Sequence, residues 1–378
     1  MKILIATPLW PPEIGGPANY AQNLAKEFRE AGHSVKVVSF VKDISRIDPQ
    51  DLKLIFFVSL NYWSGLRHFL FFCKLLPKLR RADILLALDQ FSVGWPAAMA
   101  CLFLNKPLIL RVEGDFLWES FVERTRKDIT LRDFYQNLQP LSFKESLIKK
   151  VTGWVIKRAD FLAFSSEWRR SMVVKNFGVP WEKVVIIQNA WPNLNNQLPV
   201  TSNQKIILWA GRMLYLKNVK SLIRAFSKIN DGSYELHLVG EGPERENLEL
   251  LVKKESVAGV KFFSSLTREK LLEKYKEAAF FVLPSLSDVG PNVIIEAIAT
   301  GTPFIMTKES GYAERVNDWG LLVDSLDEDD LVVKIKVLMD EKKREAYQKR
   351  LESFHSYRDW KETAGDWLGV FTKFVSKI

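Results

Sequence analysis

The segment Phe280-Phe-Val-Leu-Pro-Ser-Leu-Ser-Asp288-Val-Gly-Pro291-Asn-Val-Ile-Ile-Glu296 runs from an apolar strand into a helix and carries two carboxylates. Its four leading apolar residues predict a buried strand. Pro291 suits the first turn of a helix, because its missing N–H costs no hydrogen bond there. The segment therefore predicts a strand whose carboxyl end leads directly into the N-terminus of a helix.

An anion is expected at the start of this helix. The positive end of the helix dipole and the free amides of Asn292 and Val293, just after Gly290, favour a phosphate. Asp288 and Glu296 can then accept hydrogen bonds from hydroxyl groups on either side of the phosphate, as in a sugar and a ribose. This layout is that of a nucleotide sugar, although an ordinary strand-to-helix loop with an acidic cap would share the pattern.

Length and composition indicate a globular protein of two domains. The chain has 378 residues, of which 47% are hydrophobic and 26% charged, and it exceeds the usual size of a single core. Its cysteines, Cys73 and Cys101, form no close pair or metal-like spacing, so neither a disulfide framework nor a metal site is expected. The first apolar run is cut by Pro8, too early for a secretory segment, and we expect a cytoplasmic protein.

The net charge of +9 predicts attraction to polyanions such as nucleotides, nucleic acid or an anionic membrane. Nucleic acid is the weakest of these, because no finger or aromatic RNA-binding motif occurs and the basic residues alternate with acids along helices.

Apolar runs alternate with helical patterns along both halves, which predicts βαβ units and parallel sheets. The expected strands lie at residues 2–7, 35–40, 54–58, 84–88, 108–112 and 161–164, and then at 206–210, 236–239, 260–263, 280–283, 304–306 and 321–323.

These runs predict an α/β protein of two doubly wound, Rossmann-like domains. We expect domains at residues 1–190 and 204–359, a linker near 189–204, and a C-terminal helix at 360–378. Because ligands bind at the carboxyl ends of such strands, the site is expected in a cleft where the two domains face each other.

Two cations and two glycines follow neighbouring strands in the second half. Arg212 and Lys217 come just after the strand at 206–210, at the positive start of a helix, where cations are unfavourable unless an anion lies between them. Gly240 and Gly242 follow the next strand and let the backbone turn tightly beside a ligand.

Together these motifs resemble the retaining glycosyltransferases of the GT-B fold, and family 4 in particular. The resemblance implies that Arg212 and Lys217 neutralise the donor diphosphate, and that main-chain atoms near Ser265 and Leu266 hold the base. It also implies that Glu296 binds the ribose and Asp288 the donor sugar, although the family pattern has glutamate where this chain has Asp288. In the resembled fold the C-terminal helix, 360–378, crosses back to the first domain and completes it.

The first half carries two further motifs of the resemblance. Gly15 and Gly16 lie in the turn after the first strand, where the backbone can approach a phosphate or sugar. Asp115 remains from a His-Asp pair of which Gly114 replaces the histidine, and it is expected to orient the sugar or acceptor. No catalytic histidine is assigned.

We therefore expect transfer of a sugar from a nucleoside-diphosphate sugar to a hydroxyl acceptor, a glycan or a lipid-linked molecule, with retention of configuration and without metal or cofactor. A nucleotide-sugar epimerase and a non-catalytic nucleotide-sugar-binding subunit are the alternatives.

The segment 60–81 is aromatic at one end and basic at the other, as interfacial helices are. Pro77 and the basic residues of the segment interrupt the apolar run, which is therefore too short to span a bilayer. It predicts either peripheral membrane contact or a crossover helix with one buried face.

Overall fold

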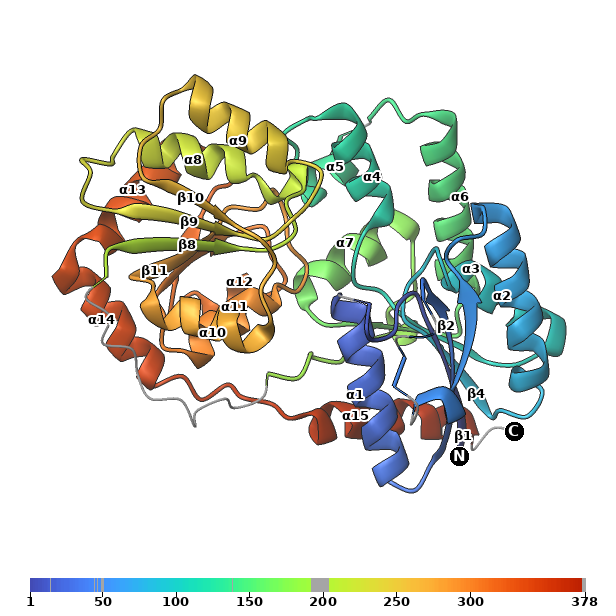
Figure 1. Ribbon diagram of the computed structural model, residues 1–378. Helices are drawn as coiled ribbons and strands as arrows, with labels where there is room; N and C mark the ends of the chain where they lie inside the picture. Colours follow the sequence, from blue (N-terminus) through green and yellow to red (C-terminus); the bar gives the residue numbers. More distant parts are fainter. Residues whose placement is uncertain are drawn as a thin grey trace. The chain divides into compact units, whose positions relative to one another are not determined.

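The computed structural model describes residues 1–13, 15–43, 45, 47–48, 51–137, 139–191 and 204–375 (Figure 1). The chain forms two compact units. Unit 1 comprises residues 1–117, 140–192 and 358–378, and unit 2 comprises residues 118–139 and 193–357. Most of the predicted linker falls outside the described residues.

Unit 1 is built on a parallel sheet in the order β3-β2-β1-β4-β5-β6-β7. Its strands are β1 (Lys2–Thr7), β2 (Ser34–Val41), β3 (Ile55–Ser59), β4 (Ile84–Ala87), β5 (Leu108–Arg111), β6 (Phe161–Phe164) and β7 (Val184–Ile186). All of them except β7 were predicted, to within one residue at each end. β7 is short and half-buried, so its sequence lacks the long apolar run of a central strand.

Helices cover both faces of this sheet. They are α1 (Gly16–Glu30), α2 (Ser64–Leu79), α3 (Gly94–Leu104), α6 (Phe143–Arg158), α7 (Glu167–Phe177) and α15 (Trp360–Val375), with short 3-10 turns at Asp51–Lys53 and Trp181–Lys183. The inner sides of α2, α3 and α6 share one core cluster, whereas α1 and α15 share the other. The buried Trp367 of α15 donates a hydrogen bond to the Tyr20 hydroxyl of α1 over 2.7 Å, which fixes the C-terminal helix to unit 1.

Unit 2 contains a second parallel sheet, in the order β10-β9-β8-β11-β12-β13. Its strands are β8 (Ile206–Ala210), β9 (Glu235–Val239), β10 (Val260–Phe263), β11 (Phe280–Leu283), β12 (Phe304–Thr307) and β13 (Leu321–Val323). Its helices are α5 (Leu131–Gln136), α8 (Val219–Ser227), α9 (Arg245–Lys254), α10 (Arg268–Glu277), α11 (Asn292–Ala299), α12 (Ala313–Val316), α13 (Glu328–Met339) and α14 (Glu341–Glu352), with a 3-10 turn at Tyr215–Lys217. The predicted α/β fold of two doubly wound parallel sheets is confirmed.

Each sheet reverses its strand order at one place. In unit 1 the reversal lies between β1 and β4, and in unit 2 it lies between β8 and β11. Ligands of open α/β sheets bind outside the carboxyl ends of the strands at such a switch point. In unit 2 the loops after β8 and β11 are therefore the expected place for a ligand.

One segment lies elsewhere than the sequence suggested. Residues 118–139, expected in the first domain, cluster with unit 2, and they include α5 and all but the start of α4 (Phe116–Thr125). The hydrophobic pattern of the sequence does not reveal this placement, because it depends on contacts between residues that are far apart in the chain.

Among the described helices, none combines the length and the apolar content needed to cross a bilayer.

Candidate active site

The predicted site residues of unit 2 gather along one edge of its sheet. Arg212 and Lys217 follow β8, Gly240 and Gly242 follow β9, Ser265 and Leu266 follow β10, and Asp288, Gly290, Asn292, Val293 and Glu296 follow β11. Because the strands are parallel, all these loops leave the sheet at its carboxyl edge. The loops that carry Lys217 and Asp288 are those that flank the switch point.

Lys217 and Asp288 form an ion pair at this point. The Lys217 Nζ lies 2.5 Å from the Asp288 Oδ2, and both side chains are partly accessible. The sequence assigned these residues to two different parts of the donor and did not predict their pairing. A diphosphate placed here would compete with Asp288 for the lysine, so the two side chains act as one unit.

Backbone contacts fix the two loops that hold this pair. The Leu286 amide donates to the Leu216 carbonyl over 2.9 Å, and the Asp288 amide donates to the Glu309 carbonyl over 3.0 Å. The buried Asn218 amide group, next to Lys217, donates to the Ser325 carbonyl over 2.9 Å. The pair therefore rests on loops that are tied together, which preorganises it for a ligand.

Arg212 is exposed at the same edge, and within the described part of the chain its side chain has no ion-pair or hydrogen-bond partner. A guanidinium presents five donors in a planar fork that matches phosphate oxygens. Arg212 can thus bind an anion without giving up a carboxylate partner, whereas Lys217 would be shared between the anion and Asp288.

Gly240 and Gly242 serve the contact between two loops. A Cβ atom on Gly240 would lie 1.9 Å from the Gly211 carbonyl oxygen, and one on Gly242 would lie 2.3 Å from the Met213 carbonyl oxygen. The Met213 amide also donates to the Glu241 carbonyl over 2.9 Å. We expected these glycines to let the backbone turn tightly beside a ligand, and the structure shows that they make room for the loop of Arg212. A ligand beside them stays a prediction.

Pro291 caps helix α11, one position before the helical turn in which it was expected, and Asn292 and Val293 are the first helical residues. Their amides belong to the first turn, whose N–H groups have no partner inside a helix. The N-terminus of α11 therefore points unpaired donors to the edge of the sheet where the cations lie.

Glu296 lies one turn into α11 and is half-buried. Among the described residues, its Oε2 atom is buried and has no hydrogen-bond partner. Burial raises the pKa of Glu296, although Arg268 and the Tyr275 hydroxyl both act to lower it. An orphaned carboxylate oxygen is unfavourable unless a ligand donates to it, which suits the predicted contact with ribose hydroxyls.

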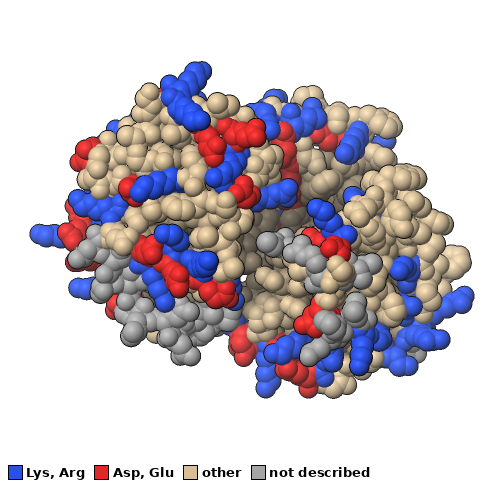
Figure 2. All heavy atoms as spheres, in the orientation of Figure 1, with Lys and Arg blue, Asp and Glu red and all other residues tan. Residues whose placement is uncertain are grey.

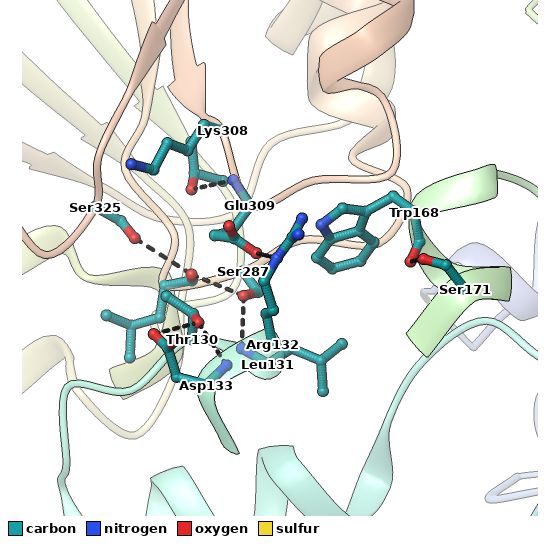
Figure 3. Close-up of polar contacts among 12 residues, drawn as sticks. Thr130, Leu131, Arg132, Asp133, Trp168, Ser171, Ser287, Lys308, Glu309 and Ser325 are labelled. Atoms are coloured by element: carbon teal, nitrogen blue, oxygen red, sulfur yellow. Dashed lines mark hydrogen bonds and ion pairs between the residues drawn. The ribbon is translucent and has the colours of Figure 1, made fainter. Parts of the chain in front are cut away.

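Segment 118–139 adds contacts to the same edge that the sequence did not reveal (Figure 3). The Leu131 amide, in the first turn of α5, donates to the Ser287 hydroxyl over 2.9 Å, and Arg132 pairs with Glu309 over 3.2 Å. Leu131 and Ser287 are 156 positions apart, so no local pattern could have joined them.

A second cluster attaches this segment near Lys217. The Tyr215 hydroxyl donates to the Arg126 carbonyl over 2.6 Å, and Lys220 pairs with Asp128 over 2.9 Å. Burial alone would lower the pKa of Lys220, but its hydrogen bonds to Tyr215 and Asp128 raise it. The loop after β8 is therefore held from outside by the segment as well as from inside by Asn218.

The predicted site residues of unit 1 lie in two different surroundings. Gly15 precedes α1 in the loop after β1, at the switch point of that sheet, and Gly16 is the first residue of the helix. Asp115 is only 3% exposed, and its Oδ2 lies 2.9 Å from the Nη2 of Arg169, which is 1% exposed. This pair indicates that Asp115 compensates a buried cation in unit 1; its expected role in orienting the sugar or the acceptor stays a prediction.

The architecture of the whole chain matches a solved structure. The structure of HepE from Anabaena in complex with UDP-glucose has a TM-score of 0.72 to this chain, with 17% identity, and covers 100% of both chains. Residues 14–191 match the family model described as Glycosyltransferase Family 4, and residues 192–353 match the model described as Glycosyl transferases group 1. The chain is a glycosyltransferase of the GT-B fold.

Two relatives of this glycosyltransferase cover most of its length. An uncharacterized glycosyltransferase of Methanocaldococcus jannaschii is 25% identical over 336 residues, which is 84% of this chain and 83% of the relative. The alpha-monoglucosyldiacylglycerol synthase of Streptococcus pneumoniae is 24% identical over 327 residues, which is 81% of this chain and 70% of the relative. Both names agree with an enzyme that transfers sugars.

Proposed function

We propose that this glycosyltransferase is a retaining enzyme of family 4 that moves a hexosyl group from a nucleoside-diphosphate sugar to a hydroxyl of a glycan or lipid-linked acceptor. It works without a metal, in the cytoplasm and in peripheral contact with a membrane. The Lys217–Asp288 pair at the switch point of unit 2 carries the proposal, since a cation and a carboxylate side by side suit a diphosphate and the sugar hydroxyls next to it.

In this proposal different residues bind different parts of the donor. Lys217, Arg212 and the first amides of α11 bind the diphosphate and stabilise the negative charge that grows on it as the bond to the sugar breaks. Asp288 holds hydroxyl groups of the sugar, and Glu296 holds the ribose. The acceptor hydroxyl forms the new bond to the anomeric carbon, and its proton passes to the departing diphosphate.

The relatives support the class of donor and acceptor. HepE was solved with UDP-glucose, which supports a nucleotide-sugar donor and makes UDP-glucose the first donor to test. The Streptococcus pneumoniae enzyme is named for a glycolipid product, which supports a lipid acceptor. Neither family model favours the epimerase or the binding subunit, because both models describe glycosyltransferases.

A screen of nucleotide sugars for thermal stabilisation, followed by assays of transfer and of donor hydrolysis, tests the proposal. One nucleotide sugar should raise the melting temperature and be consumed by the wild-type protein. A donor that binds but is neither hydrolysed nor transferred to any hydroxyl acceptor would contradict the proposal.

Asp288→Asn should lower turnover by about 10- to 100-fold, the scale of one charge-assisted hydrogen bond, and weaken binding of the free nucleoside diphosphate far less. The diphosphate lacks the sugar that Asp288 holds. Asp288→Glu should also lower turnover, because the added methylene crowds a pair that is already at 2.5 Å. Steady-state kinetics and calorimetry measure the two effects.

Asp324→Asn is the matched control for Asp288. Asp324 lies just after β13, at the same edge of the sheet, and also pairs with a lysine, Lys308. Its loss should leave turnover unchanged. If Asp288→Asn weakens diphosphate binding as much as it weakens turnover, Asp288 does not hold the sugar.

Glu296→Gln should weaken nucleoside-diphosphate binding by about tenfold or more, since a charged acceptor is replaced by a neutral one. The same change should raise the melting temperature of the free protein at neutral pH, because it removes a buried charge. Glu273→Gln changes an exposed glutamate of α10 and is the control. It should alter neither the affinity for the nucleoside diphosphate nor the melting temperature. An unchanged affinity by calorimetry would place the ribose site elsewhere.

The pH dependence has a definite sign. The pKa of Glu296 is higher in the folded protein than its ordinary value of 4.5 in the unfolded chain. Protonation of Glu296 therefore stabilises the fold at low pH, and this contribution is lost as the pH rises from 4.5 through the raised pKa. Nucleotide binding should change in the opposite sense, weakening as pH falls through the raised pKa. Glu296→Gln should abolish this part of the pH profile.

A further inference from the structure

The outer side of helix α3 is apolar, which is unusual for a helix at a protein surface. No residue of α3 is charged, and its exposed side chains are Trp95, Met99, Leu102 and Phe103. Phe103 is 70% exposed. A surface helix normally pairs its apolar stripe with a polar outer face, so the outer stripe of α3 has the composition of a covered surface.

The two neighbouring helices extend this surface. α3 packs against both α2 and α6, and the inner sides of all three share one core cluster, so their outer sides lie on the same face of unit 1 (Figure 1). Trp63, at the start of α2, is 71% exposed, and Phe143, at the start of α6, is 89% exposed. Further exposed apolar side chains are Tyr62, Phe69, Leu147 and Trp154.

The charges on this face have one sign. α2 and α3 contain no aspartate or glutamate, and the acidic residue of α6, Glu145, is buried and accepts the Ser142 amide. Lysines and arginines border the apolar side chains. The exposed ones are Lys74, Arg80, Arg81, Lys144, Lys149, Lys150 and Lys157. In Figure 2 the part of this face that is visible, at the right, shows tan atoms with Lys and Arg among them.

We propose that the outer sides of α2, α3 and α6, called here the apolar–basic face, bind the surface of an anionic lipid bilayer. The inference rests on the proposed function, whose membrane contact it assigns to a specific surface. Tryptophan and phenylalanine side chains enter the boundary between headgroups and acyl chains, and lysines bind the acidic headgroups. A face with exposed aromatics and lysines but no exposed acid is complementary to this partner.

The face is wider than the segment that the sequence suggested. The segment 60–81 predicted either an interfacial helix or a crossover helix. The structure shows that α2 is the crossover helix between β3 and β4, and that its own residues His68, Phe71 and Leu75 are buried on its inner side. The more apolar contribution comes from α3, and the larger basic one comes from α6.

Co-sedimentation of the full-length protein with vesicles tests the apolar part of the proposal. Wild type should bind vesicles of phosphatidylglycerol and phosphatidylcholine, and bind pure phosphatidylcholine much less. Phe103→Glu should reduce binding by about tenfold or more. The control, Leu250→Glu, changes a similarly exposed apolar residue of α9 in unit 2 and should bind as wild type does.

Charge reversal tests the basic part. Lys149→Glu with Lys150→Glu on α6 should weaken binding about tenfold and reduce its salt dependence, since each basic residue near an anionic surface adds to the attraction. Lys342→Glu with Lys343→Glu on α14 is the matched control. Thermal stabilisation by the nucleotide sugar should remain in every variant, which shows that each is folded.

Three outcomes would overturn the proposal. The first is that wild type fails to bind anionic vesicles at low salt. The second is that Phe103→Glu binds as well as wild type does, and the third is that Leu250→Glu loses as much binding as Phe103→Glu. A dimer that Phe103→Glu dissociates, found without vesicle binding, would assign the face to a second copy of the chain. Vesicle binding without donor turnover would uphold this inference and contradict the proposed function.

Discussion

Lys217→Ala should lower the turnover of the glycosyltransferase by about 10²- to 10³-fold, which corresponds to about 2.7–4 kcal/mol of transition-state stabilisation. Two effects act in the same direction. In the proposed mechanism the change removes a cation from the departing diphosphate, and it leaves Asp288 without the partner that lies 2.5 Å away. The carboxylate would then repel the anion that the site must hold. Turnover with the identified donor, measured under saturating conditions, checks this.

The controls for Lys217 come from the same unit. Lys228→Ala removes an exposed lysine just after α8 that pairs with Glu328 and Asp329, and it should leave turnover unchanged. Adding Asp288→Asn to Lys217→Ala should cost less than the sum of the two single changes, because the repulsion disappears with the charge. Arg212→Ala should lose turnover on a similar scale. Wild-type turnover in either single cation variant would show that the diphosphate lies elsewhere.

Asp115→Ala should lower the free energy of unfolding of unit 1 by about 3–5 kcal/mol, because it leaves a buried guanidinium without its counter-charge. Arg169 donates to the carbonyls of Glu113 and Gly114, and these bonds hold it in place but do not neutralise it. Hydrogen exchange of β5 and β6 follows unit 1 by itself, which avoids assuming that two units unfold together.

A paired replacement separates the structural role of Asp115 from a catalytic one. Asp115→Leu with Arg169→Met removes both charges and should recover most of the lost stability. Arg158→Ala breaks a partly exposed pair with Asp160 at 3.9 Å and should cost less than about 1 kcal/mol. A stable Asp115→Ala protein that has lost turnover would instead support the catalytic role that the sequence suggested.

The predictability of the site varied with the kind of signal. The sequence predicted that Lys217 and Asp288 lie at one edge of the sheet, because each follows an apolar strand, and parallel strands bring their carboxyl ends to one edge. Their direct contact was not found, since the register of two loops and the length of two side chains decide it. Asp115 shows the opposite case, in which a residue type suited to chemistry proved to be buried against Arg169.

Segment 118–139 marks the limit of pattern reasoning for the fold. It falls within the residues expected in the first domain, yet Leu131 bonds to Ser287 and Arg132 to Glu309 in unit 2. The apolar face on α3 is a similar case. Its sequence fits a fully buried helix equally well, and only the packing against α2 and α6 shows that Phe103 is left outside.

The sequence by itself determined the α/β class, the strand positions and the type of ligand expected at the carboxyl edge. These follow from periodicity, from apolar runs and from the chemistry of short loops, all of which act between residues close in the chain. Only the tertiary structure decided which charges pair, which glycines make room for another loop, and which apolar side chains stay exposed. Those outcomes depend on contacts between segments that are far apart in the chain. The interatomic distances and the burial of each group set the interaction energies there, and neither can be derived from local sequence patterns.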